Sequence, residues 1–235
     1  QSTRSINGDD AMRARLLFIL LVLTASGRAL WALPGPVDVE RARALLSSGE
    51  VLEATLLLRQ IVEEGDTEAR ALARYHLGVL RVHADDCEGA LGWLGPAADS
   101  LSDATLALDA VFRVGVCEAR LGRPERAESE VSRRLSRLRA TWGSAVPEAE
   151  IALRALLLAL PLGRADWIAA WTGGDVEQAF ERILAGVPSA RAAALLDLPR
   201  VSPAIRARLL DALAGAGGVG PLIDAALAAS GPGES

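Results

Sequence analysis

The two histidines, His76 and His83, are the residues of this chain best suited to proton transfer or metal binding. They stand seven residues apart, so on a helix they share one face, and Asp85, Asp86 and Cys87 follow directly. A zinc site would favour a closer pair, such as two histidines at i and i+4, which the sequence does not provide here. The two aspartates are typical of helix caps. We therefore expect no metal site.

A second stretch with a chemical signature is Gly215-Ala-Gly217-Gly-Val-Gly220, which matches the G-x-G-x-x-G pattern of dinucleotide-binding proteins. That pattern requires a strand before it and a helix after it. The residues before it, Ile205 to Leu213, instead have the spacing of an amphipathic helix. We interpret the glycines as a turn between helices, and we expect no cofactor.

The sequence offers few other residues for catalysis. All 25 basic residues are arginines, which excludes a P-loop or a Schiff base, because both depend on lysine. We find no arrangement typical of a Ser-His-Asp or Cys-His nucleophile, and two histidines leave little for acid–base chemistry near neutral pH. We predict a non-catalytic protein. The alternative is an enzyme whose helical scaffold carries a site in the region Trp142–Trp171.

The elements that position these residues are predicted to be helices. The chain has 235 residues, of which 51% are hydrophobic but only 4% aromatic, so its apolar mass is mainly Ala, Leu and Val. Ala and Leu favour helices, whereas the aromatic residues that favour strands are scarce. We predict an all-α fold. The formal net charge of −5 argues against a nucleic-acid-binding protein, because such proteins usually carry a basic face.

A repeated pattern of small residues lies between about residues 69 and 138. Gly78 corresponds to Gly115, and Ala90 to Ala127, both at an offset of 37 residues. A fixed period of this length, with small residues where two short helices would cross, is typical of stacked helical hairpins. A weaker third copy precedes these two, with its small or apolar residues at Ala42, Gly49, Ala54 and Leu58.

These residues resemble tetratricopeptide repeats. In that family a Leu-Gly pair lies midway along the first helix, a Gly marks the turn, and an Ala in the second helix is followed four positions later by a large residue. The two copies place at these positions Leu77-Gly78, Asp85, Ala90 and Leu94, and then Val114-Gly115, Gly122, Ala127 and Val131. The resemblance implies an α-α superhelix of hairpins over residues 37–140, followed by a less regular helical extension over residues 147–230.

The sequence departs from the family pattern in one place that affects a helix. Gly92, Gly95 and Pro96 fall inside the second helix of one unit. Proline in a helix interior costs about 3 kcal/mol. We therefore expect this helix to end early or to kink near Gly95.

The resemblance also implies a concave groove lined by the first helix of each unit. The residues that it places there form an aromatic and aliphatic stripe with a cation at one end: Tyr75, Val79, His83, Phe112, Val116 and Arg120. Such a stripe suits an extended or helical peptide segment of a protein partner. The alternative is that the chain's own C-terminal helices cover these side chains. Trp167 and Trp171, one helical turn apart, are expected to pack those helices onto the stack, with a partner hot spot as the alternative.

The two cysteines, Cys87 and Cys117, are a candidate for a single disulfide. In a stack of hairpins Cys87 opens one helix and Cys117 lies late in the next, and consecutive antiparallel helices bring such positions together. A bridge across this loop would contribute about 3–4 kcal/mol in the entropic model. The alternative is a pair of buried free thiols.

The N-terminal region has the order of a secretory signal peptide over residues 12–32. A basic start at Arg13 and Arg15 precedes ten apolar residues from Leu16 to Ala25, and small polar residues follow. Ten residues are too few to span a bilayer, which takes about 20. We interpret residues 1–11 as an upstream segment and predict an exported, periplasmic protein, with an uncleaved membrane anchor as the alternative.

Together these features predict an interaction scaffold of the bacterial cell envelope, with another protein or a peptide segment as its partner. The strongly apolar stretch Glu148–Leu160 is expected to be a helix that is buried on several sides. Self-association through this helix is a further alternative.

Overall fold

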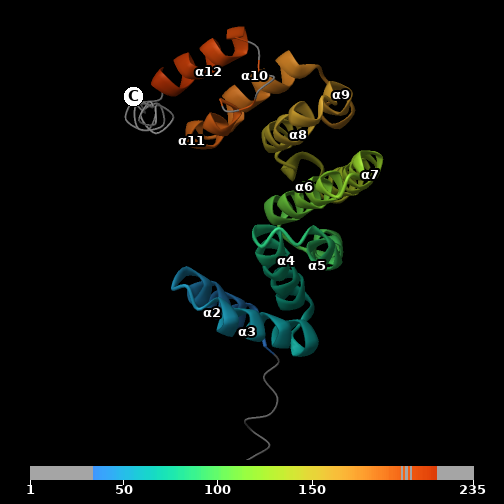
Figure 1. Cartoon of the computed structure of the whole chain (residues 1–235), viewed down its shortest axis with the longest axis vertical. Helices are drawn as coiled ribbons and strands as arrows, with labels where there is room; N and C mark the ends of the chain where they lie inside the picture. Colours follow the sequence, from blue (N-terminus) through green and yellow to red (C-terminus); the bar gives the residue numbers. More distant parts are fainter. Residues whose placement is uncertain (1–33, 197, 199–200, 202, 216–235) are drawn as a thin grey trace, which may run out of the picture. The chain divides into compact units, whose positions relative to one another are not determined.

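In the computed structural model, residues 34–196, 198, 201 and 203–215 are described, and their regular structure is helical throughout (Figure 1). The predicted all-α fold is therefore confirmed. The chain divides after Arg70 into two compact units, which we describe separately. Residues 1–11, the predicted signal peptide at 12–32 and most of the glycine-rich segment at 215–220 lie outside the described residues.

The first unit contains one helical hairpin, formed by α2 (Pro36–Ser47) and α3 (Val51–Glu64). Pro36 occupies the first turn of α2, where its missing N–H costs nothing. Gly49 makes the turn with φ of +86°, a backbone conformation that glycine adopts without strain. The facing sides of the two helices are buried through Val39, Ala42, Ala54, Leu58 and Ile61.

The second unit, from Ala71 onward, contains the remaining helices. They are α4 (Thr67–His83, which begins before the boundary), α5 (Cys87–Ser100), α6 (Ala104–Arg120), α7 (Pro124–Trp142), α8 (Glu148–Leu162), α9 (Ala165–Thr172), α10 (Val176–Gly186), α11 (Ser189–Ala192) and α12 (Pro203–Gly215), with short 3-10 turns at Gly143–Ala145 and Ala193–Leu195.

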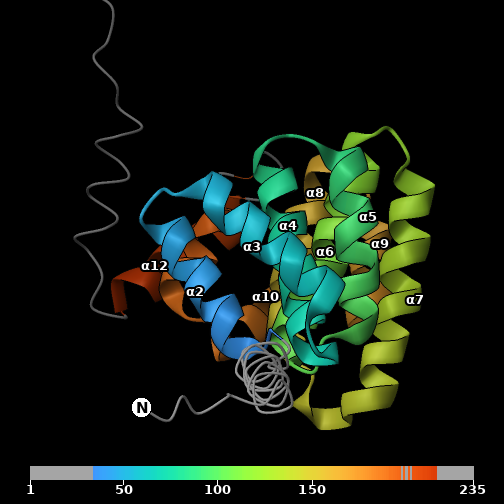
Figure 2. The same ribbon diagram turned by 90° about the horizontal axis from the view of Figure 1, so that it is seen from below.

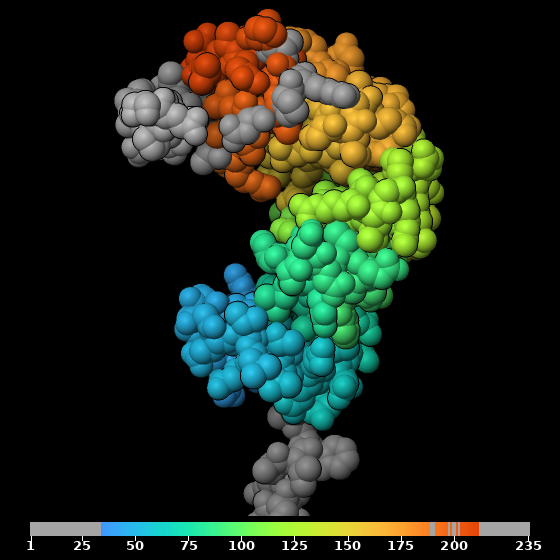
Figure 3. All heavy atoms as spheres, viewed as in Figure 1, coloured from blue at the N-terminus to red at the C-terminus, as the bar shows by residue number. Residues whose placement is uncertain are grey.

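Successive helices of the second unit pack on one another in chain order, α5 on α6, α6 on α7, and α8 on both α9 and α10. Helix α6 also contacts α8. Figure 2 shows α4, α6 and α8 in one layer of this unit and α5, α7 and α9 in a second. The space-filling view shows the hairpins following one another along the unit (Figure 3). This packing is consistent with a helical superhelix.

The glycines of the repeat lie where helices approach most closely. A Cβ added to Gly78 would stand 2.5 Å from Cγ of Leu94, and one added to Gly115 would stand 2.6 Å from Cγ2 of Val131. Both distances are below 3.0 Å, so a side chain at either glycine would force its neighbour to shift. The alanines of the repeat, Ala90 and Ala127, are fully buried. The structure thus confirms that small residues mark the helix crossings.

Helix α5 is longer than the sequence suggested. It continues through Pro96 to Ser100, so the expected early end near Gly95 is wrong, and the alternative of a kink there stays a prediction. The proline removes the hydrogen bond to the carbonyl of Gly92, but Gly92 is exposed and water can satisfy that group. The last turn is also held from outside, because Arg134 donates a hydrogen bond to the carbonyl of Gly95 at 3.1 Å.

The C-terminal helices are joined to the stack by tryptophans and by α8. Trp167 and Trp171 are almost completely buried, and the Trp171 ring meets Phe112 edge to face at 5.7 Å, as expected for a packing role. Most of α8 is buried, which confirms its predicted environment. Self-association through this helix would therefore require the stack to open. Within the described residues, no helix combines the length and apolarity needed to cross a membrane.

Candidate functional site

The six predicted groove residues do not form one continuous exposed surface. Tyr75 and Phe112 are buried, Val79 and Val116 are half-buried, and only His83 and Arg120 are exposed. Phe112 is covered by Trp171, so the alternative that C-terminal helices cover the stripe holds for this residue. Arg120 pairs with Asp85 at 3.2 Å. Of the six, Phe112 and Val116 line a cavity.

That cavity lies between α6 and α8 and has a volume of about 230 Å³. We call it the α6–α8 pocket. Its lining combines apolar and charged side chains: Asp109, Phe112, Arg113 and Val116 from α6, and Arg154, Leu157 and Leu158 from α8. The residues from α6 fall at intervals of three and four, which places them on one face of the helix. The charged residues of the pocket were missed by sequence reasoning. The available signal was Arg154, a lone charge within the apolar run of α8.

Asp109 is the centre of a hydrogen-bonded cluster that joins three helices. Tyr75 of α4 donates its hydroxyl hydrogen to Oδ2 of Asp109 at 2.7 Å. Arg113 donates from Nε to the same oxygen, and Arg154 donates from Nη1 to Oδ1 at 2.6 Å. The Asp109 side chain is only 11% exposed, so these three donors replace the water that it has lost.

The electrostatics of the cluster follow from burial and from the arginines. Burial alone would raise the pKa of Asp109, but the charges of Arg154 and Arg113 outweigh it and hold that pKa below its usual value. Burial raises the pKa of Tyr75 to about 12, and the nearby negative charge of Asp109 acts in the same direction. At neutral pH Asp109 is therefore an anion and Tyr75 a neutral donor.

A second carboxylate extends the cluster along α8. Oε2 of Glu150 lies 3.8 Å from Nε of Arg154, and Oε1 of Glu150 forms an ion pair with Nη1 of Arg191 at 2.7 Å. Asp109 and Glu150 thus face Arg113, Arg154 and Arg191, which leaves one positive charge in excess. We refer to these five residues with Tyr75 as the Asp109 cluster.

The arrangement is suited to binding rather than to proton transfer. The low pKa of Asp109 and its three donors leave it a weak base. The two guanidinium groups are fixed beside an apolar wall, a combination that can hold an anionic group attached to an apolar one. Among the described residues, no three His, Cys, Asp or Glu side chains gather as a metal site would require.

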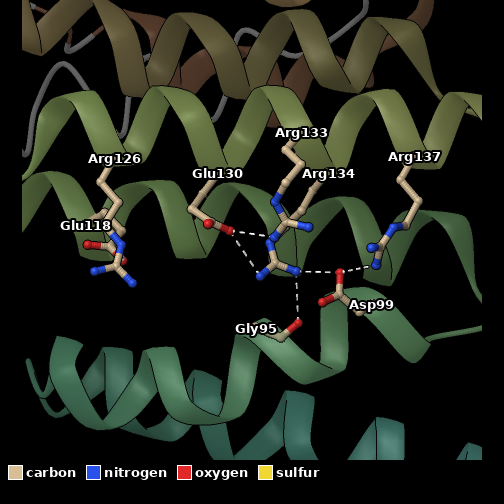
Figure 4. Close-up of polar contacts among 8 residues, drawn as sticks. All are labelled: Gly95, Asp99, Glu118, Arg126, Glu130, Arg133, Arg134 and Arg137. Carbon is tan, nitrogen blue, oxygen red and sulfur yellow. Dashed lines mark hydrogen bonds and ion pairs between the residues drawn. The ribbon is translucent and has the colours of Figure 1, made fainter.

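A different cluster of charge lies between α7 and α5 (Figure 4). Arg134 is 8% exposed and reaches from α7 to Asp99 at 2.5 Å and to the carbonyl of Gly95. Its Nη2 lies 3.2 Å from Glu130, which also accepts from Arg133 at 2.8 Å. Arg137 completes the group with a 2.7 Å contact to Asp99. We call Asp99, Glu130, Arg133, Arg134 and Arg137 the Arg134 cluster.

The two cysteines lie together, as predicted from the order of the helices. Both are buried and present as free thiols. Burial raises the pKa of the Cys117 thiol to about 12, and the neighbouring Cys87 thiol adds to the shift. The bridge between them stays a prediction.

Comparison of the chain with models of protein families, with curated proteins and with solved structures gives no match. The resemblance to tetratricopeptide repeats therefore rests on the residues of this chain.

Proposed function

We propose that the protein is a non-catalytic scaffold that binds a segment of another protein on the face formed by α6 and α8. The observation that carries this proposal is the α6–α8 pocket, where Phe112 and Val116 of the predicted groove stand beside Arg113 and Arg154. Its volume of about 230 Å³ is smaller than the range of about 300–1,000 Å³ typical of small-molecule sites. A pocket of this size suits one or two side chains of a peptide.

The tetratricopeptide-like character and the location are part of the same proposal. Small residues at the helix crossings support stacked hairpins, on which binding of extended or helical segments is a common use. The residues 12–32 support export, and we place the protein in the bacterial envelope on that basis alone.

A selection from a displayed library of random linear peptides tests this function. The full chain is compared with Leu157→Trp, which fills the pocket with a larger side chain, and with Leu162→Trp. Leu162 is a matched control because it lies on the same helix, is 41% exposed and does not line the pocket. Circular dichroism and urea unfolding establish that both variants fold.

We expect the wild type and Leu162→Trp to enrich the same peptides and Leu157→Trp to lose them. Enrichment that is the same for all three proteins would place binding elsewhere on the chain. A wild type that enriches no peptide would count against the scaffold itself.

A further inference from the structure

We infer that the α6–α8 pocket recognises one carboxylate of an internal Asp or Glu side chain, followed or preceded by an apolar residue, in the segment that the scaffold binds. This inference rests on the proposed function and specifies its ligand.

The net positive charge of the pocket lining favours a ligand that carries one negative charge. Its lining holds Arg113 and Arg154 but only one carboxylate, that of Asp109. Glu150 does not balance the difference, because it is shared between Arg154 at 3.8 Å and Arg191 at 2.7 Å. One added carboxylate neutralises the excess. A phosphate group, with a charge of about −1.5 to −2 at neutral pH, would exceed it.

The donors of the two arginines are only partly used. A guanidinium group has five N–H donors. The hydrogen bonds to Asp109 use Nε of Arg113 and Nη1 of Arg154. The Nε of Arg154 is buried 3.8 Å from Oε2 of Glu150 and is not open to the pocket, so the donors left for a ligand are those of the Nη groups. Asp109 therefore orients both groups without saturating them, and a second carboxylate finds donors that are already in place.

The surroundings strengthen the attraction for an anion. The side chains of Arg113 and Arg154 are 29% and 15% exposed, so both have lost much of their water. A charge-assisted hydrogen bond in such a site is stronger than one at an open surface. The excess charge of the Arg134 cluster, in contrast, resides on Arg133 and Arg137, which are 47% and 51% exposed.

The apolar part of the pocket accounts for the neighbouring apolar residue. Val116 and Leu157 are half-buried, and Phe112 is held in place by the Trp171 ring. These groups can cover the carbon stem of an acidic side chain and one adjacent side chain. The pocket lies midway along α6 and α8. We assign its ligand to an internal side chain, and the peptide with a free C-terminal carboxylate tests that assignment against a chain terminus.

The test begins with the peptides enriched by the wild-type full chain and lost by Leu157→Trp. We expect one position of these peptides to be enriched in Asp or Glu. The most enriched peptide is then made with both ends capped, in three forms that carry Glu, Gln or phosphoserine at that position. A fourth form carries Gln there and a free C-terminal carboxylate. Binding to the full chain is measured by fluorescence anisotropy.

We expect the Gln peptide to bind at least about tenfold more weakly than the Glu peptide, because it loses one charge-assisted hydrogen bond. The phosphoserine peptide and the Gln peptide with a free C-terminal carboxylate should not regain the affinity of the Glu peptide. Arg113→Gln should bind the Glu and Gln peptides alike, at the affinity that the wild type has for Gln. Arg137→Gln is the matched control, because Arg137 is exposed and belongs to the Arg134 cluster, and it should bind as the wild type does.

A second variant guards against a folding defect in Arg113→Gln. Val116→Glu places a carboxylate of the chain itself in the pocket, and it should abolish the preference for Glu over Gln. Equal binding of Glu and Gln by the wild type would overturn the inference and leave the scaffold in place. Stronger binding of the phosphoserine or free-terminus form would also overturn it. If the library yields no peptide that depends on the pocket, the proposed function itself fails.

Discussion

The Asp109 cluster and the Arg134 cluster bury similar charges in two different ways. Each joins neighbouring helices through arginines and carboxylates, and each has at its centre a side chain that is close to fully buried. In the Arg134 cluster the buried group is a cation that donates to Asp99 and to the carbonyl of Gly95 and forms an ion pair with Glu130 (Figure 4). In the Asp109 cluster the buried group is an anion, and a cavity of about 230 Å³ opens beside its arginines.

The difference shows how to separate a structural charge network from a binding site. Arg134 has protein partners on three sides, although its Nε, like that of Arg154, is buried without a hydrogen-bond partner among the described residues. The two arginines around it, Arg133 and Arg137, are exposed to water. Such a network holds α7 on α5 and needs no ligand. The surplus cation of the Asp109 cluster instead faces a partly desolvated cavity, where a ligand carboxylate gains the most from it. We therefore assign structure to one cluster and recognition to the other.

The largest effect is expected from removing the anion at the centre of the pocket. Asp109→Leu leaves two partly buried guanidinium groups without their partner, so we expect the free energy of unfolding to fall by about 3–5 kcal/mol. Asp99→Leu should cost only about 1–2 kcal/mol, because Arg134 keeps Glu130 and a backbone carbonyl. Urea unfolding of both variants measures the two losses. Equal losses would remove the distinction between the clusters.

Two glycine substitutions, one at a helix crossing and one in open space, test how closely α6 packs on α7 and α8. An added methyl at Gly115 would meet Val131 of α7 at 2.6 Å and the pocket residue Leu158 at 2.9 Å. Gly115→Ala should therefore cost about 1–3 kcal/mol. Gly92→Ala, in a helix position with nothing within 4 Å, should stabilise by about 0.5–1 kcal/mol. The urea midpoint should therefore fall for Gly115→Ala and rise for Gly92→Ala. An unchanged midpoint for Gly115→Ala would refute the close approach of α6 to Val131 and Leu158.

Tyr75 gives the Asp109 cluster a pH dependence at the alkaline end. Its pKa is about 12 in the folded protein against 10.0 ordinarily, so between these values the unfolded state has lost a proton that the folded state keeps. The free energy of unfolding should then fall as the pH rises from about 10 to 12, by about 1–2 kcal/mol from Tyr75 after allowance for solvent screening. Tyr75→Phe should lack this part of the decrease.

Tyr75 can also be titrated directly, because it is the only tyrosine of the chain. Tyrosinate absorbance near 295 nm should rise around pH 12 in the folded protein and around pH 10 in urea. Titration at the same pH in both conditions would mean that Tyr75 is not buried against Asp109.

The smallest effect concerns the cysteines, which belong to neither cluster. Cys87 and Cys117 are buried, and burial raises the pKa of Cys117 to about 12, so a thiol reagent should label neither in the folded protein near pH 8. Labelling in urea without reductant counts the thiols, two if they are free and none if they are bridged. Rapid labelling of the folded protein would contradict the buried placement.

The sequence predicted the elements better than the site. Gly78 and Gly115 located helix crossings because a glycine there leaves a periodic signal. Phe112 and Val116 were placed in the groove by the resemblance to tetratricopeptide repeats. Arg154 was not, because it lies on α8, beyond the repeated pattern, and which residues face α6 depends on how the two helices pack. Tyr75 was expected to face a partner, but a buried hydroxyl requires an acceptor, and Asp109 supplies it.

The most direct test of the contrast between the clusters is an NMR titration of the full chain with the selected acidic peptide, observing the arginine Nε–H signals. Signals are assigned from the variants Arg113→Gln, Arg137→Gln and Arg154→Gln. We predict that the peptide shifts the signals of Arg113 and Arg154 and leaves that of Arg137 unchanged. A shift concentrated on Arg137, with Arg113 and Arg154 unaffected, would contradict the assignment of recognition to the α6–α8 pocket.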